Sequence, residues 1–236
     1  TGLGTSANTS NNFFTARGGR SSEGNIQLDG MNVGSSVGGG GVSGYQYDMS
    51  NASEVQVTIA GGLAEVDRGG PAFNMIPKTG GNDFTGSYFA TLAGKWAQGS
   101  NIDDELRAYG FTDLPALIKN WDTNVAISGP VLRDRVWFFG NLRTIGNYQD
   151  RPNEYANLNA GNPNNWTYDR DMSVKVRGST SKKIVAGRLT WQASQRNKIG
   201  FYMDYTKNCS AASVVPDSGQ CRDPGDDWTA AGPGIG

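Results

Sequence analysis

The side chains that carry out most protein chemistry are scarce in this sequence. Histidine is absent from all 236 residues, which removes the commonest general base and a common metal ligand. Nucleophilic pairs of the Ser-His or Cys-His type are therefore impossible. Nothing in the sequence places two carboxylates around one cleft, as glycosidase chemistry requires. We expect a protein that is not an enzyme and that uses no cofactor.

Two acidic clusters, Asp103–Glu105 and Asp223–Asp227, are the candidates for cation binding. Neither follows the spacing of an EF-hand loop, so the sequence favours solvated loop charge and no metal site. The glycine run Gly38–Gly41 invites comparison with a phosphate-binding loop. It lacks the following Gly-Lys-Ser/Thr and a helix, so a flexible loop is favoured there. The net charge of −1 excludes an electrostatic footprint for nucleic acid.

Tryptophans could stack on sugars, and their positions divide them into two groups. Trp121, Trp137 and Trp191 fall near the ends of expected strands, where membrane barrels place interfacial aromatic residues. Trp166 and Trp228 fall in expected loops. With Tyr45 and Tyr47, which follow the glycine run, they are the candidate ligand contacts.

The stretch Ser53–Ala90 contains the clearest structural pattern. Val55, Val57 and Ile59 alternate with polar residues, which predicts a half-buried strand. The glycine-rich breaks that follow, a short apolar segment at 73–76 and a turn at 78–82 lead into a new alternating strand at Phe84. Upstream, Ile26 and Leu28 precede Asp29-Gly30, a strong hairpin turn pair.

Five later segments alternate between an apolar and a polar face, which is typical of barrel strands. They are Phe84–Leu92, Trp121–Ser128, Val136–Arg143, Ile184–Ala193 and Lys198–Thr206, and we expect them to form consecutive antiparallel strands of one sheet. The connections at 129–135 and 194–197 are short. Those at 95–120, at 149–183 and from 207 onward are long. A helix starting near Asp103 is as plausible as a loop in the first long connection.

No stretch approaches the roughly 20 apolar residues of a spanning helix, whereas a barrel strand spans with about 10 residues, of which only alternate ones are apolar. The amino terminus has no initiator Met, basic region or apolar region. We therefore expect this chain to be a piece of a longer protein.

Several blocks of this sequence resemble a known protein family. The block FNMIPKTGGNDFTGSYF, preceded by Arg68-Gly69-Gly70, resembles the end of the plug and the first barrel strand of TonB-dependent outer-membrane receptors, closest to their Oar-like branch. GPVLRDRVWFF resembles a periplasmic hairpin of the same family, and ARGGR with NIQLDGMNV resembles an earlier plug strand and its turn. Pro77 departs from the pattern, since Thr or Val is usual there. The plug-motif positions are Arg17, Arg20, Asp29, Gly30, Gly69, Gly70, Asn74, Lys78, Gly80 and Asn82.

The resemblance implies a mostly β fold: the carboxyl-terminal part of a plug domain at 1–82, then about five antiparallel strands of an incomplete outer-membrane β-barrel at 83–236. It implies a receptor in the outer membrane of a Gram-negative bacterium. Such a receptor imports a scarce ligand, such as a siderophore, oligosaccharide or peptide. The TonB complex would supply energy through a TonB box that precedes this chain. Outer-membrane lipid would be a further partner.

The cysteines acquire a role in this setting. Cys209 and Cys221 would share one external loop in an oxidising compartment, which favours a disulfide over free thiols. Closing that loop would stabilise the fold by about 3 kcal/mol in the chain-entropy model.

Two expectations separate this reading from its alternative, a secreted soluble adhesin or carbohydrate-binding module with a buried apolar face. The apolar side chains of the five strands should share the face that points away from the plug; they are Val125, Ile127, Phe138, Leu142, Leu189, Phe201 and Met203. On the opposite face, Arg143 or Arg188 should meet the plug at Glu54–Arg68.

Overall fold

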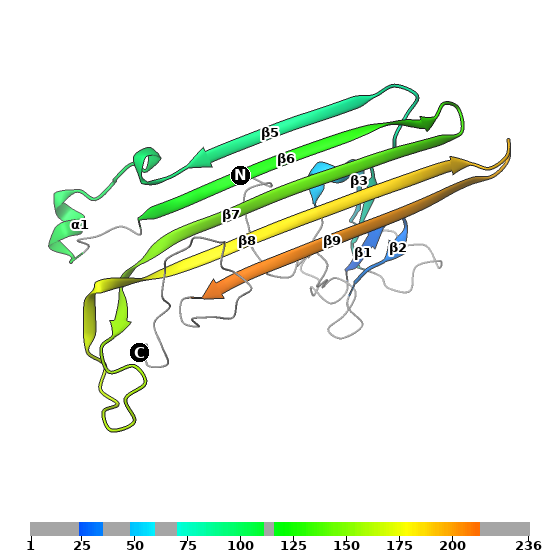
Figure 1. Cartoon of the computed structure of the whole chain (residues 1–236). Helices are drawn as coiled ribbons and strands as arrows, with labels where there is room; N and C mark the ends of the chain where they lie inside the picture. The colour runs from blue at the N-terminus through cyan, green and yellow to red at the C-terminus, as the bar shows by residue number, and fades with distance from the viewer. Residues whose placement is uncertain (1–23, 35–47, 60–69, 111–115, 213–236) are drawn as a thin grey trace.

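The computed structural model describes residues 24–34, 48–59, 70–110 and 116–212, which form two β-sheets (Figure 1). The smaller sheet has the strand order β2-β1-β4-β3, and the larger has the order β5-β6-β7-β8-β9. The strands are β1 Asn25–Leu28, β2 Met31–Asn32, β3 Ala52–Thr58, β4 Ala72–Pro77, β5 Thr85–Ala93, β6 Leu117–Leu132, β7 Val136–Asn157, β8 Arg170–Gln192 and β9 Lys198–Ala212. Three short helices accompany them: η2 Met49–Asn51, η3 Lys95–Ala97 and α1 Asp104–Ala108.

The predicted Asp29-Gly30 turn is confirmed in the smaller sheet. It joins β1 to β2, with φ of 51° at Asp29 and 81° at Gly30. Positive φ at both positions is the geometry that tight hairpins demand and that Asp-Gly tolerates. Ile26 and Met75 are buried in the centre of this sheet. The turn thereby brings the Asp29 carboxylate to the rim of the small sheet.

The predicted strand at 53–59 is also confirmed, but its apolar face is open. β3 is the edge strand and pairs with β4 alone among the described strands. Val55, Val57 and Ile59 are exposed rather than half-buried. Alternation identified the strand correctly, because the strand period is local, whereas burial depends on what lies over the face.

The five predicted antiparallel strands form one sheet in sequence order, as expected. Figure 1 shows them side by side, with the small sheet lying against one face. No helix in the described ranges is long and apolar enough to cross a membrane.

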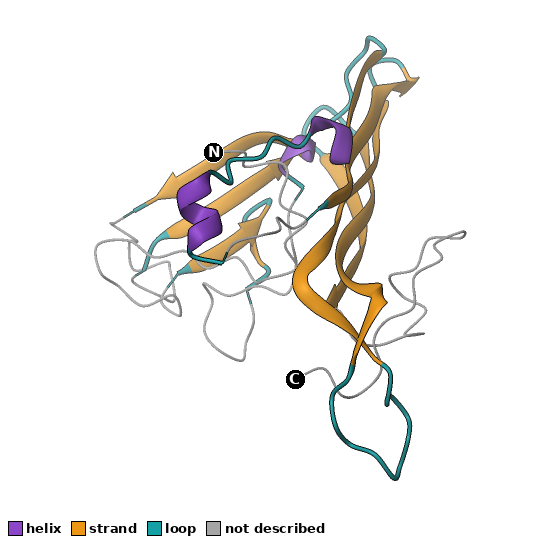
Figure 2. Cartoon of the chain, turned by 90° about the vertical axis from the view of Figure 1, so that its left-hand side faces the viewer, coloured by secondary structure: helices purple, strands orange, loops and turns teal. Residues whose placement is uncertain are grey.

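The strands are much longer than the alternation predicted. β7 has 22 residues and β8 has 23, so the connection expected at 149–183 shrinks to 158–169. The ladder runs on through polar positions, for example Asn147 opposite Thr180 and Gln149 opposite Gly178, because backbone pairing continues where the apolar pattern stops. The β7–β8 hairpin therefore projects well beyond the rest of the sheet (Figure 2).

The first long connection contains the helix that the sequence left open. Asp103 caps α1 by accepting a hydrogen bond from the Leu106 backbone nitrogen at 2.9 Å. Gly110 follows with a φ of +90°, the left-handed conformation that ends helices. The acidic residues around Asp103 thus serve as a cap and a first helical turn. Among the described residues, no group of acidic or cysteine side chains is arranged to hold a metal ion.

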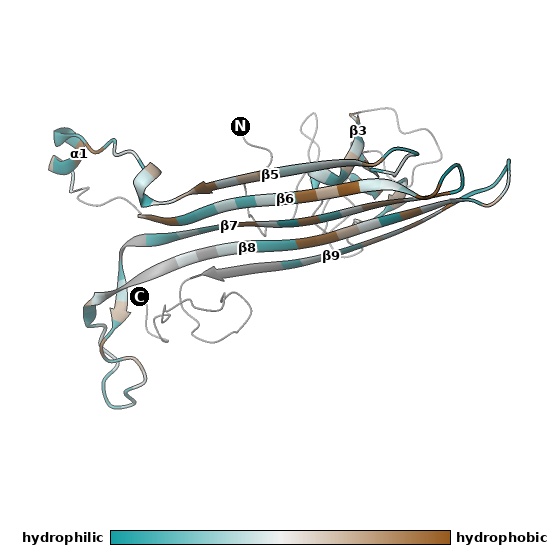
Figure 3. Ribbon diagram, turned by 45° about the horizontal axis from the view of Figure 1, so that its top comes forward, coloured by the Kyte–Doolittle hydropathy of each residue, from teal (hydrophilic) through white to brown (hydrophobic). Residues whose placement is uncertain are grey.

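One face of the large sheet is an exposed apolar band. Tyr88, Val125, Leu142, Val185 and Tyr205 lie opposite one another on the five successive strands, and all are 42–72% exposed. Ile127, Leu189, Phe201 and Met203 share this face and are also exposed. Phe138, opposite Leu189, shares the face but is half-buried. Figure 3 shows hydrophobic and hydrophilic segments following one another along β6 and β8. The predicted common face is confirmed.

Trp121 does not occupy the exposed strand end predicted for it. It lies inside β6, is buried, and packs edge-on against Tyr148 with ring centroids 4.9 Å apart. Its indole nitrogen donates to Thr144 Oγ1 at 3.1 Å. Trp137 and Trp191 do lie close to the ends of β7 and β8. The prediction failed for Trp121 because β6 begins four residues earlier than the alternation indicated.

Candidate functional site: the interface between the two sheets

An arginine clamped by two carboxylates forms the centre of the interface. Arg143, on the polar face of β7, donates from Nε to Asp122 Oδ1 at 2.9 Å and from Nη2 to Asp122 Oδ2 at 2.7 Å. Its Nη1 donates to Oδ1 of Asp48, which lies beside the small sheet. The side chains of Arg143, Asp48 and Asp122 are 12%, 0% and 4% exposed. The planar guanidinium can hold two carboxylates at once, and both ion pairs are shielded from solvent.

Asp48 is held in place by local structure. It is the N-cap of η2, accepting from the Ser50 backbone nitrogen at 3.1 Å. Ser50 Oγ in turn accepts from Asn124 Nδ2 of β6 at 2.7 Å, and Asn124 Oδ1 accepts from Asn141 Nδ2 at 2.8 Å. Asp-x-Ser is a recognisable capping pattern. A polar layer therefore runs from the start of β3 across β6 to β7.

A second arginine makes the other contact between the sheets. Arg188 of β8 donates from Nη2 to Asp29 Oδ2 at 2.8 Å and from Nη1 to the carbonyl oxygen of Pro77 at 3.1 Å. Pro77 ends β4 opposite Ala52, so its missing N–H costs little ladder pairing. Backbone pairing beside β3 and β4 extends one residue past Pro77, because the backbone nitrogen of Lys78 donates to the Asn51 carbonyl oxygen at 2.8 Å.

The partners predicted for these arginines lie in the segment Glu54–Arg68, and a contact with its residues 60–68 stays a prediction. Within the described residues, Arg143 meets Asp48 and Arg188 meets Asp29. Glu54 instead accepts a hydrogen bond from Gln56 Nε2 at 3.0 Å. Residues 60–68 lie outside the described part of the chain. The sequence identified the polar face, but the carboxylate in reach of each arginine depends on how the sheets are docked.

Several buried atoms of this layer have no protein partner in the described ranges. They include Asp48 Oδ2, both side-chain polar atoms of Asn51 and Asn141 Oδ1. Lys182 of β8, which is 8% exposed, is a buried cation in addition to Arg143 of β7. Buried polar atoms without protein partners are where ordered water is expected. The interface is therefore lined by polar groups at these positions rather than by an apolar core.

The residues predicted as a plug motif fix the small sheet and the segment that leads from it to the large one. Asn74 accepts from the Gly30 backbone nitrogen at 3.0 Å, and Lys78 Nζ donates to the Ser50 carbonyl at 2.8 Å. Asn82 holds the β6–β7 turn: its Oδ1 accepts from the Asp134 backbone nitrogen at 3.0 Å and from Trp137 Nε1 at 2.7 Å. The segment between the sheets is thus anchored at both of its ends.

Gly80 lies where a side chain would not fit. An added Cβ would lie 2.9 Å from the backbone nitrogen of Phe138 and 3.0 Å from the carbonyl oxygen of Gly129. Both obstacles are backbone atoms of paired strands. We expect Gly80→Ala to destabilise the fold by about 1–3 kcal/mol through overpacking, which should lower the thermal unfolding midpoint by several degrees in circular dichroism.

Gly81→Ala is the matched control for this prediction, because nothing lies within 4 Å of a Cβ at Gly81. It should leave the midpoint unchanged. Equal midpoints for the two variants would show that the turn does not pack against β6 and β7.

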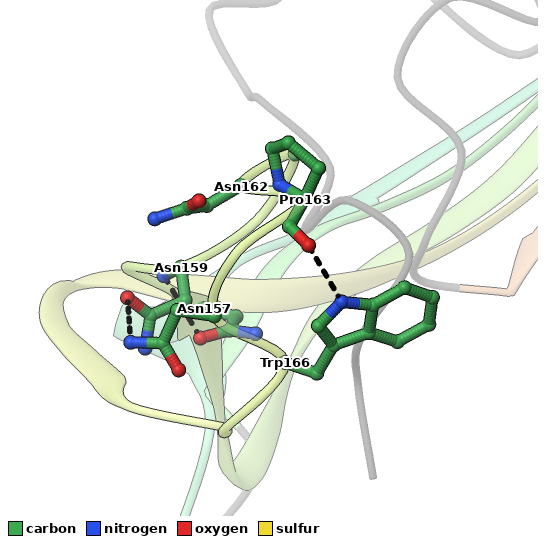
Figure 4. Close-up of a pocket in the computed structure, with 7 residues that line it drawn as sticks. Asn157, Asn159, Asn162, Pro163 and Trp166 are labelled. Carbon is green, nitrogen blue, oxygen red and sulfur yellow. Dashed lines mark hydrogen bonds between the residues drawn. The ribbon is translucent and has the colours of Figure 1, made fainter.

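A separate pocket lies in the β7–β8 loop (Figure 4). It has a volume of about 330 Å³ and is lined by Asn157, Asn159, Asn162, Pro163, Asn165 and Trp166, with Gly161 at a φ of +79°. Trp166 is 90% exposed, and its indole nitrogen donates to the Pro163 carbonyl at 2.9 Å. Of the predicted ligand contacts, Trp166 is the one that the structure describes.

The other predicted site residues are placed as follows. Gly70 is separated from β4 by one residue. Cys209 lies in β9 and not in the loop expected from 207 onward, because β9 continues to Ala212. The remaining ones lie outside the described residues: Arg17, Arg20, Tyr45, Tyr47, Gly69, Cys221 and Trp228. The pairing of Cys209 with Cys221 stays a prediction. Sequence reasoning missed Asp48, whose signal was the capping pattern, and Asn157, which carried none.

Comparison with known proteins adds one relative. The "TonB-dependent transporter Oar" of Myxococcus xanthus is 25% identical over 198 residues, an alignment that covers 76% of this chain and 18% of that protein. The chain is distantly similar to a TonB-dependent transporter. It spans about a fifth of the relative's length. That relative is named as a transporter rather than an enzyme, and no protein family model matches the chain.

Proposed function

We propose that this chain is part of a TonB-dependent outer-membrane receptor of the Oar-like branch. In this proposal, residues 1–82 are the carboxyl-terminal part of the plug and residues 83–236 are the first strands and external loops of the barrel. The proposal rests on one observation above all: the large sheet has a continuous exposed apolar face and an opposite polar face that contacts the small sheet.

The exposed face has the character of a lipid-facing surface. The row from Tyr88 to Tyr205 crosses all five strands without a charged residue, and Ile127, Phe201 and Met203 extend it. Soluble monomers rarely leave an apolar patch of this extent open to water. In a bilayer the same side chains would contact hydrocarbon instead of water, because alternate outward positions of a barrel strand face the lipid.

The open edges of the sheet support a barrel rather than a free sheet. Among the described strands, β5 pairs only with β6, and β9 pairs only with β8. Unpaired backbone groups in hydrocarbon cost several kcal/mol each. In a membrane, both edges therefore need further strands, and a closed barrel supplies them.

The interface suits a plug that has to move. The ion pairs at Arg143 and Arg188 and the buried polar atoms near them can be replaced by contacts with water when the sheets separate. A dry apolar interface of the same size would resist separation by the hydrophobic effect. Under the proposal, energy from the TonB complex displaces this contact so that a scarce ligand passes.

A lipid-contact experiment tests the proposal. The experiment uses the complete receptor proposed to contain this chain, with the native cysteines replaced by serine. Leu142→Cys and Leu158→Cys are each labelled with an environment-sensitive fluorophore, and the labelled receptor is reconstituted in vesicles. Both positions are exposed, but Leu142 lies in the apolar band and Leu158 in the β7–β8 loop. We expect the Leu142 label to shift to the blue and to be quenched by lipids brominated on their acyl chains.

The Leu158 label should behave as in water. A Leu142 label that is not quenched, together with a monodisperse protein that does not associate with vesicles, would contradict the membrane proposal. That outcome would favour the soluble adhesin or carbohydrate-binding module.

A further inference from the structure

We propose that the pocket in the β7–β8 loop binds a neutral saccharide, with one sugar ring stacked on Trp166 and hydroxyl groups bonded to Asn157. The inference rests on the proposed function only for the outward position of this loop; the pocket chemistry stands on its own.

The loop lies far from the apolar band. Leu142 and Asn157 are 15 residues apart on β7, which corresponds to about 50 Å of extended strand at about 3.3 Å per residue. A span of hydrocarbon requires only about 10 residues. The hairpin tip therefore projects into solvent (Figure 2), where it can meet a ligand before any other part of the described sheet.

Trp166 is held with its ring presented to solvent. A tryptophan that is 90% exposed loses favourable burial, and here it is also oriented, because Nε1 is bonded to Pro163. With its N–H satisfied inside the loop, the indole offers a flat apolar surface and no polar group. Such a surface fits the apolar C–H face of a pyranose ring.

Asn157 supplies a directed hydrogen-bond donor. Its side chain is among the buried polar ones, at 8% exposure. Its Oδ1 accepts from the backbone nitrogens of Asn159 and Asp169, both at 3.0 Å. Nδ2 makes no hydrogen bond with any described residue, and Figure 4 shows the amide nitrogen on the side toward the Trp166 ring. A hydroxyl oxygen would satisfy it.

The loop around these two residues is built to keep its shape. Asn159 Nδ2 donates to the Thr167 carbonyl at 2.9 Å, and Asn165 Nδ2 donates to Asn159 Oδ1 at 3.1 Å. Thr167 in turn donates to Asn165 Oδ1 at 2.7 Å. A preorganised loop loses little conformational entropy when a ligand binds.

The lining selects the ligand class. It contains asparagine, glycine, proline and tryptophan and no charged residue, so it offers no counter-charge to a phosphate, a carboxylate or a cationic ligand. Its volume of about 330 Å³ lies at the lower end of small-molecule sites, which is adequate for one or two sugar units. Amide donors beside an aromatic face are the chemistry that a neutral sugar satisfies.

Calorimetric titration of the full chain tests the inference, in a zwitterionic detergent without a sugar headgroup. The probes are maltohexaose, cellohexaose and laminarihexaose, with hexagalacturonate as the charged counterpart. We expect at least one neutral hexasaccharide to bind, and hexagalacturonate to bind at least tenfold more weakly. Trp166→Ala should weaken binding at least tenfold, whereas Trp166→Phe, which keeps a ring, should retain most of it.

The matched control is Trp96→Ala, which removes another highly exposed tryptophan, in η3. It should leave the affinity unchanged. Asn157→Asp keeps the acceptor oxygen and removes the donor, so it should weaken binding severalfold even if Trp166→Ala fails to fold. No binding of the three neutral probes, or equal losses in Trp96→Ala and Trp166→Ala, would overturn the inference. The vesicle experiment has a separate readout, so a protein that binds sugar without entering lipid would refute only the membrane proposal.

Discussion

Replacing Arg143 with methionine is expected to release the small sheet from the large one. The substitution keeps most of the side-chain volume but leaves the carboxylates of Asp48 and Asp122, 0% and 4% exposed, without their cation. Removing one partner of a buried ion pair costs about 3–5 kcal/mol, because the remaining charge is not solvated. Here two carboxylates face each other across the vacated position, so repulsion adds to the loss.

Hydrogen exchange measures this effect directly. The small sheet has short strands of two to seven residues, so it should not persist once undocked. Amide exchange in β1 and β4 should therefore accelerate by about 10²- to 10³-fold in Arg143→Met, while exchange in the central strand β7 changes far less.

Arg107→Met provides the matched control. Its ion pair with Asp104 joins side chains that are 63% and 101% exposed, and exposed pairs contribute about 0–1 kcal/mol. Exchange in β1 and β4 should remain as in the parent protein. If Arg143→Met also left that exchange unchanged, the arginine would be a bystander and the sheets would be held by other contacts.

Replacing Leu142 with arginine is expected to destabilise the protein in a bilayer. Leu142 lies in the apolar row that crosses all five strands, on the central strand, and is 58% exposed. An arginine at the midplane of a membrane barrel costs about 2–4 kcal/mol. Urea titration of the complete receptor proposed to contain this chain, folded in vesicles and followed by tryptophan fluorescence, should show a stability loss of up to that size.

Leu132→Arg is the control, at a residue that ends β6 beside the short turn and is 53% exposed. The cost of a charge falls to about 0–1 kcal/mol near the membrane surface, so this variant should be nearly as stable as the parent. A soluble protein would tolerate both substitutions equally, because both side chains would face water. Equal and small losses would therefore contradict a lipid-facing band.

The sequence by itself determined the architecture of the large sheet. Alternation between Val136 and Arg143 and between Ile184 and Ala193 identified neighbouring strands, because side-chain direction along a strand has a strict period of two. The short connections then required antiparallel pairing in sequence order. The same alternation predicted that Leu142 points one way and Arg143 the other, since consecutive residues cannot share a face. The Asp29-Gly30 turn was equally local.

Only the tertiary structure decided which groups meet across the interface. Asp48 reaches Arg143, 95 residues away, and Asp29 reaches Arg188, 159 residues away, because the docking of the two sheets sets these distances. The extension of β7 and β8 also escaped the pattern, since their outer halves are polar and are held by backbone ladders that carry no side-chain period. The orientation of Trp166 depends on a hydrogen bond to the carbonyl oxygen of Pro163. Every residue has such a carbonyl group, so the sequence does not show which one the indole nitrogen meets; the folded loop decides it.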